Sequence, residues 1–261
     1  GELMDLVHTD PPYNAKVEPR SNNSAILGRG HLYANTFKGQ SSSKVLRPKD
    51  RVLLNDKMSN EDYQEILHKW FENFSKVLKP GGAFYLWGGY CNIENYPAAM
   101  AGLDLHFSQT IIWVKEHPVL GRKDFLGNHE WCFYGWKSGA AHWFNPEIKN
   151  ATDTWSVKKV NPNAMVHLTE KPVELAERAL TYSSKPGEKV LDLFGGSGST
   201  LIACEKLKRK AYLIELDGPY CDIILTRWQN FTGKQAILEK TGESFDSRTN
   251  SSTQPGPDAC A

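Results

Sequence analysis

Apolar positions in the first half of the chain alternate between strand-like and helix-like spacing. Residues 3–9 are a short apolar run, which predicts a buried strand that stops at the two prolines after Asp10. Apolar residues then recur at helical spacing over 63–78, behind Ser59 as a helix cap. Further strands are predicted over 83–89 and 106–115, and a hairpin-like pair follows, with 129–137 as its clearest strand.

The second half of the chain repeats this alternation. The pattern predicts a helix over 171–183, a strand over 189–194, a helix from Ser199 to about 207, a strand over 211–216 and a last helix from Asp217 to about 231. Strands that alternate with helices predict an α/β fold, with a doubly wound and mostly parallel sheet. Ligands on such sheets bind beyond the carboxyl ends of the strands, where the winding reverses.

We expect one folded domain over residues 1–241. Residues 14–57 carry nine Lys or Arg against three acidic residues and are rich in Ser, Asn and Gly, so we interpret them as a basic insertion. Residues 138–166 read as irregular and polar, as a reduced target-recognition region would. From 242 onward apolar residues almost disappear, which predicts a disordered tail over 242–261.

Charge and cysteine content exclude several classes of protein. The net charge of the 261 residues is +1, so any surface for nucleic acid must be local. The five cysteines include no C-x-x-C pair, which argues against a zinc site or a disulfide framework and for a reducing compartment. No apolar run approaches the roughly 20 residues of a membrane span, and there is no signal-peptide pattern. These features predict a cytoplasmic protein with neither a metal nor a membrane partner.

A glycine-rich turn, DLFGGSGST at 192–200, lies between a predicted strand and a predicted helix. Gly195, Gly196 and Gly198 let the backbone turn sharply and approach a ligand closely. The turn lacks the lysine of a phosphate loop, and Glu215 ends the next strand about twenty residues later, where an acid can accept hydrogen bonds from ribose hydroxyls. Together they predict a ribose-containing ligand such as S-adenosylmethionine (SAM). The alternative is a turn kept for packing.

Asp10-Pro11-Pro12-Tyr13, followed downstream by this glycine turn, resembles the amino-methyltransferases of DNA. In that family DPPY is the catalytic motif and Phe-Gly-Gly-Ser-Gly the SAM motif, and their order here resembles the β group. HLTEKPVELAERAL at 167–180 resembles a further cofactor segment of that group, and residues 118–145 and 167–235 resemble phage and prophage adenine methylases. The resemblance covers residues 3 to about 235. It implies the Rossmann-like, seven-stranded fold of SAM-dependent methyltransferases and a place in phage DNA modification or restriction-modification.

The resemblance implies methyl transfer from SAM to the exocyclic N6 amine of adenine in DNA, by direct displacement on a flipped-out base, which leaves S-adenosylhomocysteine. The lone pair of this amine is delocalised into the ring, so acceptors on its N–H groups are needed to free it. The Asp10 side chain and the Pro11 carbonyl suit this task, and Pro12 helps to fix the backbone. Tyr13 is expected to stack on the base, so Tyr13→Phe should keep most activity and Tyr13→Ala should lose it.

The remaining expected contacts divide between cofactor and DNA. Lys171 is expected to reach the methionine carboxylate or nearby backbone, unless it is only an exposed residue at a helix start, and Asp217 is either a helix cap or an adenine contact. The expected cofactor residues are Asp10, His167, Thr169, Lys171, Phe194, Gly195, Gly196, Ser197, Gly198, Ser199, Thr200, Glu215 and Asp217. The expected DNA contacts are basic residues, unless they belong to solvated loops: Lys16, Arg20, Arg29, Lys38, Lys44, Arg47, Arg122 and Lys123.

Two other functions fit the same motifs. A cytosine-N4 methyltransferase is possible because the acceptor motif recognises an amine more than a ring, although Asp at position 10 favours adenine and Ser would favour cytosine. A catalytically silent SAM- or DNA-binding module also fits, because only nine residues precede Asp10 where relatives place a strand and an acidic residue. We therefore expect either a truncated sequence or a pocket wall from elsewhere. The resemblance also implies a homodimer, and the small recognition region predicts a short or relaxed target sequence.

Overall fold

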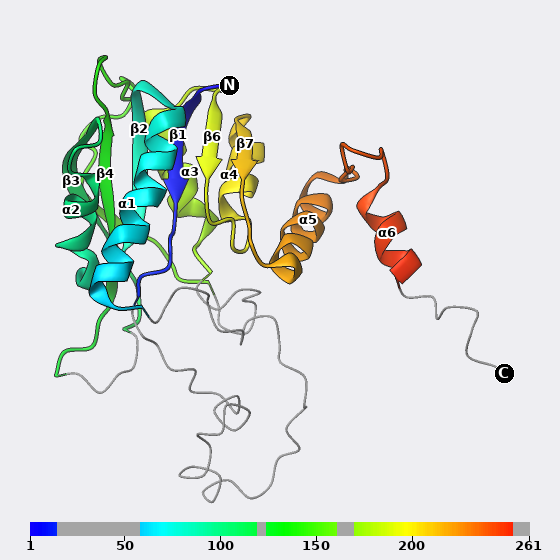
Figure 1. Cartoon of the computed structure of the whole chain (residues 1–261), viewed down its shortest axis with the longest axis horizontal. Helices are drawn as coiled ribbons and strands as arrows, with labels where there is room; N and C mark the ends of the chain where they lie inside the picture. The colour runs from blue at the N-terminus through cyan, green and yellow to red at the C-terminus, as the bar shows by residue number, and fades with distance from the viewer. Residues whose placement is uncertain (15–57, 119–123, 161–169, 253–261) are drawn as a thin grey trace, which may run out of the picture.

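The computed structural model of the chain describes residues 1–14, 58–118, 124–160 and 170–252 (Figure 1). Its strands form a single sheet of seven in the order β5-β3-β4-β2-β1-β6-β7 among the described residues. The strands are β1 (Met4–Thr9), β2 (Leu78–Gly88), β3 (Leu105–Val114), β4 (His129–Lys137), β5 (Thr154–Ser156), β6 (Lys189–Asp192) and β7 (Lys210–Leu213). The helices are α1 (Asn60–Val77), η4 (Tyr90–Asn92), α2 (Asn95–Met100), α3 (Val173–Ser183), α4 (Ser199–Leu207), α5 (Gly218–Thr232) and α6 (Phe245–Ser252).

The sheet is mostly parallel and doubly wound, as the sequence predicts. β1 pairs in parallel with β2 on one side and with β6 on the other, while β4 is antiparallel to both β2 and β3. From β1 the chain passes through α1 to β2, and from β6 it passes through α4 to β7 on the opposite side. The winding therefore reverses between β1 and β6, which is where such sheets bind ligands.

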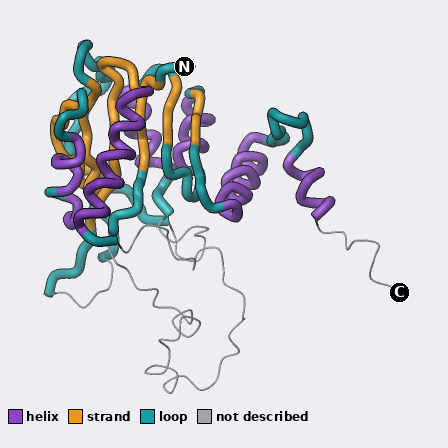
Figure 2. The backbone as a smooth tube through the Cα atoms, viewed as in Figure 1, coloured by secondary structure: helices purple, strands orange, loops and turns teal. Residues whose placement is uncertain are grey.

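Helices cover both faces of the sheet (Figure 2) because side chains along each strand alternate between two apolar clusters. On β1, Leu6 packs into the cluster formed with α3 and α4, and Val7 packs into the cluster formed with α1 and α2. Both side chains are fully buried, and each such burial contributes about 1.5–3 kcal/mol. No helix in the described part of the chain could cross a bilayer.

Helix α1 begins and ends where the sequence predicts. Ser59 caps it by accepting a hydrogen bond from the Asp62 N–H at 3.0 Å. The helix stops at Val77, and β2 then begins at Leu78 rather than at residue 83. The early start fits because the register with β1 is irregular between Met4 and Leu6, which leaves room for the Pro-Gly-Gly stretch as a bulge.

Two segments are more ordered than their composition suggests. Within 138–166, read as irregular, β5 joins the sheet in parallel with β3, and Trp155 is buried in the apolar core. The prediction of a disordered tail over 242–261 is wrong for α6 (Phe245–Ser252), while residues 253–261 lie outside the described part. Asp246 of α6 accepts hydrogen bonds from the side-chain amides of Gln229 and Gln235. These polar contacts help to hold α6 in place.

Candidate active site

The carboxyl ends of β1 and β6 lie side by side and bring the two sequence motifs together. The Thr9 hydroxyl at the end of β1 donates to Asp192 Oδ1 at 2.8 Å, and the Leu193 N–H donates back to Thr9 Oγ1 at 3.1 Å. The turn that starts at Asp10 therefore begins next to the glycine turn. The convergence of these two distant segments, which the sequence predicts, is confirmed.

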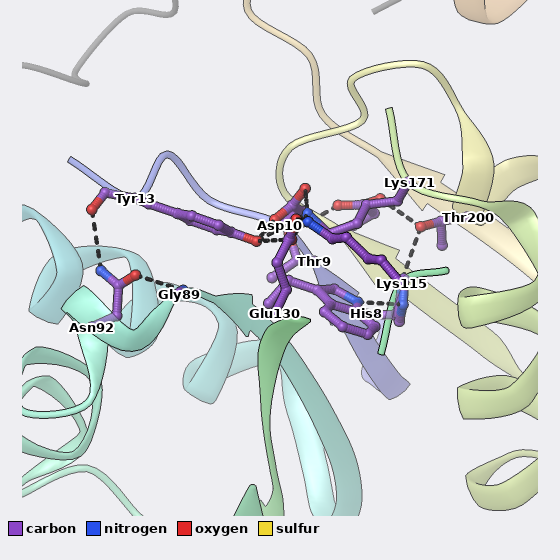
Figure 3. A network of polar contacts seen from close by, with 12 residues as sticks. His8, Thr9, Asp10, Tyr13, Gly89, Asn92, Lys115, Glu130, Lys171 and Thr200 are labelled. Carbon is purple, nitrogen blue, oxygen red and sulfur yellow. Dashed lines mark hydrogen bonds and ion pairs between the residues drawn. The ribbon is translucent and has the colours of Figure 1, made fainter. Parts of the chain in front are cut away.

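A cluster of two carboxylates and two ammonium groups surrounds the first turn (Figure 3). Asp10 Oδ2 accepts from Lys171 Nζ at 2.7 Å, and Asp10 Oδ1 accepts from the Tyr13 hydroxyl at 2.8 Å. Glu130 Oε2 lies 2.9 Å from Lys171 Nζ and 3.1 Å from Tyr13 Oη. Lys115 Nζ donates to Glu130 Oε1, so the formal charges of the four groups cancel.

Burial and neighbouring charges act in opposite directions on the pKa values of Glu130, Lys171 and Asp10. Burial acts to raise the pKa of Glu130, but Lys171 and Lys115 outweigh it and hold that pKa at about 2. Burial acts to lower the pKa of Lys171, but Asp10 and Glu130 raise it above its ordinary value. The pKa of Asp10 is raised, first by burial and then by Glu130, with Lys171 opposing. The Asp10 side chain is still 23% exposed, so a substrate can reach it.

Hydrogen bonds from two other elements fix the backbone of the Asp10–Tyr13 turn. The Tyr63 hydroxyl of α1 donates to the Pro12 carbonyl at 2.9 Å. The Asn92 amide of η4 donates to the Tyr13 carbonyl at 3.2 Å and to Tyr63 Oη at 2.9 Å. Tyr63 and Asn92 are both buried, so the Pro12 and Tyr13 carbonyls are held in place before any substrate arrives.

Asn14, directly after the turn, clasps the start of the next described segment. Its Nδ2 donates to the Met58 carbonyl at 3.1 Å, and its Oδ1 accepts from the Met58 N–H at 2.8 Å. Residues 15–57 lie outside the described residues, but the chain on either side of them meets at this pair. The predicted basic insertion thus leaves and rejoins the core beside the candidate catalytic turn.

The glycine turn combines positive φ angles with close packing. Gly196 and Gly198 have φ of 53° and 78°, and the Gly196 N–H donates to Glu215 Oε2 at 2.8 Å. A Cβ at Gly195 would lie 3.0 Å from Ile224 of α5, and one at Gly198 would lie 3.3 Å from it. Packing therefore explains part of the glycine requirement, whereas the half-buried backbone at Gly196 remains suited to a ligand.

Hydrogen bonds from uncharged side-chain donors hold the glycine turn in place. Asp192 accepts from the hydroxyls of Thr9 and Thr200 at 2.8 and 2.7 Å. His8 Nδ1 lies 3.0 Å from Thr200 Oγ1, and Trp87 Nε1 donates to His8 Nε2 at 2.9 Å. Burial lowers the pKa of His8 to about 3, so the ring is neutral, and it raises the pKa of Asp192 to about 7.

The structure gives Lys171 a partner that the sequence does not predict. Its side chain is 8% exposed and binds Asp10, so the interpretation as an exposed helix-start lysine is wrong. Lys171 contacts the Asp10–Tyr13 turn, and its expected reach to the methionine carboxylate or nearby backbone stays a prediction. Asp217 occupies the N-cap of α5 but makes no side-chain capping bond, although its own N–H donates to Glu215 Oε1 at 2.9 Å.

Other predicted cofactor residues line the second turn. Phe194 packs edge-on against Trp70 of α1, with ring centroids 4.8 Å apart. Arg227 donates to the Ser197 carbonyl and pairs with Glu170, which ties the turn to the segment before α3. Ten predicted residues lie outside the described part of the chain: His167, Thr169, Lys16, Arg20, Arg29, Lys38, Lys44, Arg47, Arg122 and Lys123.

Sequence reasoning missed Lys115 and Glu130. Both occur in apolar stretches, IIWVK and HEWCF, where a charged residue has to be exposed or paired. That position was the available signal, but it does not identify the partner. Among the described residues, no group of three or more His, Cys, Asp or Glu could hold a metal ion.

Comparisons with known proteins agree with this geometry. The sequence profile of the family N6_N4_Mtase, described as DNA methylase, matches residues 4–226. The type II methyltransferase M2.DpnII of Streptococcus pneumoniae is 29% identical over 241 residues, which cover 87% of this chain and 82% of that protein. The fold matches the M1.HpyAVI–SAM complex with a TM-score of 0.63 at 20% identity, over 87% of this chain and 89% of the other. It also matches the cytosine-N4-specific PvuII DNA methyltransferase with a TM-score of 0.62 at 15% identity, over 87% and 80%.

Proposed function

The chain belongs to the N6_N4_Mtase family of DNA methylases, and we propose that it transfers a methyl group from SAM to the exocyclic N6 amine of adenine. The observation that carries this proposal is the pairing of β1 with β6, which sets the Asp10 turn beside the glycine turn. One turn offers acceptors for an amine, and the other offers a site for the methyl donor. Transfer in a single displacement requires such proximity.

The residues of the glycine turn fit a ribose-containing donor. Each Glu215 oxygen accepts one backbone N–H, from Gly196 or Asp217, and a carboxylate oxygen has room for a further donor such as a hydroxyl. The M1.HpyAVI complex, which carries SAM, has the same fold. When bound, SAM supplies an electrophilic methyl group on a sulfonium. Glu215 and the backbone around Gly196 are the groups we assign to hold it.

The Asp10 turn would activate the amine. The Asp10 carboxylate and the Pro11 carbonyl accept its two N–H bonds, which draws the nitrogen toward a tetrahedral form and frees its lone pair. Tyr63 fixes the neighbouring Pro12 carbonyl, so the backbone of the turn is held in place before attack. After attack the nitrogen is cationic and acidic, and Asp10 or water takes its proton. The Tyr13 ring would stack on the flipped-out base, which offsets part of the cost of extruding it.

The choice of adenine rests on the residue at position 10. The family unites N6 and N4 methylases, and the fold matches a cytosine-N4-specific enzyme as well. Both targets present an amine conjugated to a ring, so Asp10 and Pro11 could activate either. Asp rather than Ser at this position favours adenine by resemblance to the family.

Mass spectrometry of nucleosides tests the proposal directly. DNA incubated with SAM and the protein is digested, and N6-methyladenine and N4-methylcytosine are quantified against an Asp10→Ala control. We expect N6-methyladenine that depends on Asp10. N4-methylcytosine alone would replace adenine by cytosine as the target, and the absence of both with a folded, SAM-binding protein would favour the silent binding module.

The proposed partners are DNA and a second copy of the chain. The basic residues of 15–57 and 119–123 would contact phosphates, and a homodimer is implied by family resemblance. Light scattering of the protein alone measures its mass, and a mass of 29.4 kDa at micromolar concentration would contradict the dimer.

A further inference from the structure

Both oxygens of the Asp10 carboxylate are already engaged inside the protein. Lys171 Nζ donates to Oδ2 and the Tyr13 hydroxyl donates to Oδ1. An amine that takes Asp10 as its acceptor must therefore compete with two donors, of which Lys171 is buried and Tyr13 is half-buried. Leaving a buried donor without a partner is unfavourable, and more so for a charged one. Substrate binding would therefore be weakened unless both donors found another acceptor.

Glu130 provides a second acceptor within reach of both donors. Its Oε2 lies 2.9 Å from Lys171 Nζ and 3.1 Å from Tyr13 Oη. The Tyr13 hydroxyl has a single proton, which it can give to either Asp10 or Glu130. Lys171 has three protons and already lies between the two carboxylates. Neither donor has to move far to remain paired when it leaves Asp10.

We propose that Glu130 is a positioning residue that takes over the hydrogen bonds of Lys171 and Tyr13 when the target amine engages Asp10. The exchange keeps Lys171 and Tyr13 paired while Asp10 turns from an internal partner into the acceptor of the substrate. The inference rests on the proposed function, because it requires an amine as the incoming group.

The surroundings of Glu130 hold it in the orientation that this role needs. Glu130 lies on β4 and pairs with Trp113 of β3. Lys115 follows Trp113 by two residues. The Lys115 side chain is 6% exposed, its ammonium lies 4.9 Å from the centre of the Trp113 ring, and it binds Glu130 Oε1. With Oε1 fixed on the hairpin, Oε2 is left to face Lys171 and Tyr13. Glu130 is thus built into a rigid strand and aimed at the donors of the catalytic turn.

The rival role for Glu130 is that of a structural counter-ion for Lys171. Loss of a structural counter-ion would lower the stability of the fold. Loss of the second acceptor for Lys171 and Tyr13 would slow the chemical step and shift the acid limb of the pH profile. The charged and titratable groups that face Asp10 are Lys171, Tyr13 and Glu130, with Lys115 acting through Glu130. Among them, the Glu130 charge raises the pKa of Asp10. Its removal should therefore shift the acid limb toward lower pH.

Glu130→Gln tests the inference in the full-length protein, with tritiated methyl transfer from SAM to DNA as the assay. We expect kcat to fall about 10- to 100-fold, the range for loss of a charge-assisted hydrogen bond. KM for SAM should stay within about twofold, because in the described part of the chain no Glu130 contact reaches the glycine turn. The matched control is Glu116→Gln at the end of the same hairpin, where Glu116 is half exposed and pairs with exposed Lys158; it should behave like the parent.

Each outcome decides between the two roles. A Glu130→Gln protein with the parental kcat and pH profile would overturn the inference. Should this variant unfold, Glu130→Asp keeps the charge but withdraws the oxygen, and we expect a kcat between those of parent and Gln variant with the acid limb unmoved; parental kcat there would overturn the inference as well. If the parent itself transfers no methyl group to DNA, the proposed function fails first, and that result is distinct from a failure of Glu130.

Discussion

Two aspartates stand at the ends of neighbouring strands, and their environments differ. Asp10, after β1, is bound by an ammonium group and a hydroxyl within a cluster of charges. Asp192, at the end of β6, accepts from the hydroxyls of Thr9 and Thr200 and from the Phe194 N–H, and no ammonium group binds it directly among the described residues. Asp10 is partly exposed, whereas Asp192 is 4% exposed.

Under the proposed function, this difference separates a carboxylate that engages the substrate from one that supports the glycine turn. The partners of Asp10 have an alternative acceptor in Glu130, so Asp10 can exchange them for a substrate. The partners of Asp192 have their places fixed by the backbone of β1 and α4, so its bonds hold the glycine turn in one shape. The same side chain can serve chemistry or architecture, according to whether its donors are replaceable.

The strongest test of this contrast is to remove each aspartate in turn. Asp10→Ala should lower the methyl-transfer rate by at least about 10³-fold, since it removes a preorganised acceptor. Its unfolding free energy should change little, because Lys171 and Tyr13 keep Glu130 as a partner. Asp192→Ala should instead destabilise the fold and clearly lower the unfolding temperature, because buried hydroxyls lose their acceptor. Equal destabilisation by both would erase the distinction.

Asp192 should contribute a pH-dependent part of the stability. Its folded-state pKa of about 7 lies above the ordinary carboxyl value of about 4, so the folded protein binds the proton more tightly. This contribution to stability is complete below about pH 4 and is lost as the pH rises through about 7, by up to about 1.4 kcal/mol per pH unit. Denaturant unfolding of parent and Asp192→Asn from pH 4 to 8 measures it. A difference between the two that does not vary with pH would contradict the assignment.

Substitutions of Tyr13 test the turn that contains Asp10. Tyr13→Ala should lower kcat/KM for DNA roughly 10- to 100-fold, the range for loss of base stacking. Tyr13→Phe should stay within a few-fold of the parent, because the ring remains and only the hydroxyl that competes for Asp10 Oδ1 is lost. Steady-state kinetics with one duplex give both values. Equal losses in the two variants would move the role of Tyr13 from its ring to its hydroxyl.

The smallest effect is expected at Gly198, on the supporting side. Gly198 and Gly102 have φ of 78° and 77°, so an alanine costs each about 1–2 kcal/mol of backbone strain. Only at Gly198 does the new Cβ also meet Ile224, whereas at Gly102 nothing lies within 4 Å. We expect Gly198→Ala to weaken SAM binding several-fold, as measured by calorimetry. Gly102→Ala is the matched control and should keep the parental affinity. Equal SAM affinity in the two would show that the turn tolerates a shift.

The sequence predicts the parts of this molecule that depend on local chemistry. Two prolines end β1 and a run of glycines ends β6, so both turns and their place at the reversal of the sheet follow from local signals. Helix α1 follows likewise from Ser59 and its apolar repeat. By contrast β5 is only three residues long, and α6 is held by polar contacts from Gln229 and Gln235, which periodicity does not reveal.

The charge cluster could not be predicted because it depends on register between distant elements. Glu130 faces the catalytic turn only because β4 pairs with β2 and β3 in one particular alignment. Lys171 reaches Asp10 from the segment before α3, and no spacing in the chain encodes that meeting. Family resemblance identifies Lys171 as important but assigns it to the cofactor, and only the assembled sheet reveals its contact with Asp10.

The Asn14–Met58 clasp has a consequence for how this protein could change over time. The two flanks of residues 15–57 are joined by two hydrogen bonds, so both ends of that stretch are fixed at one place on the core. For a flexible connection between two fixed ends, the entropy of closure grows only slowly with its length. Insertions and deletions between Asn14 and Met58 are therefore compatible with an unchanged position of both ends beside the Asp10–Tyr13 turn.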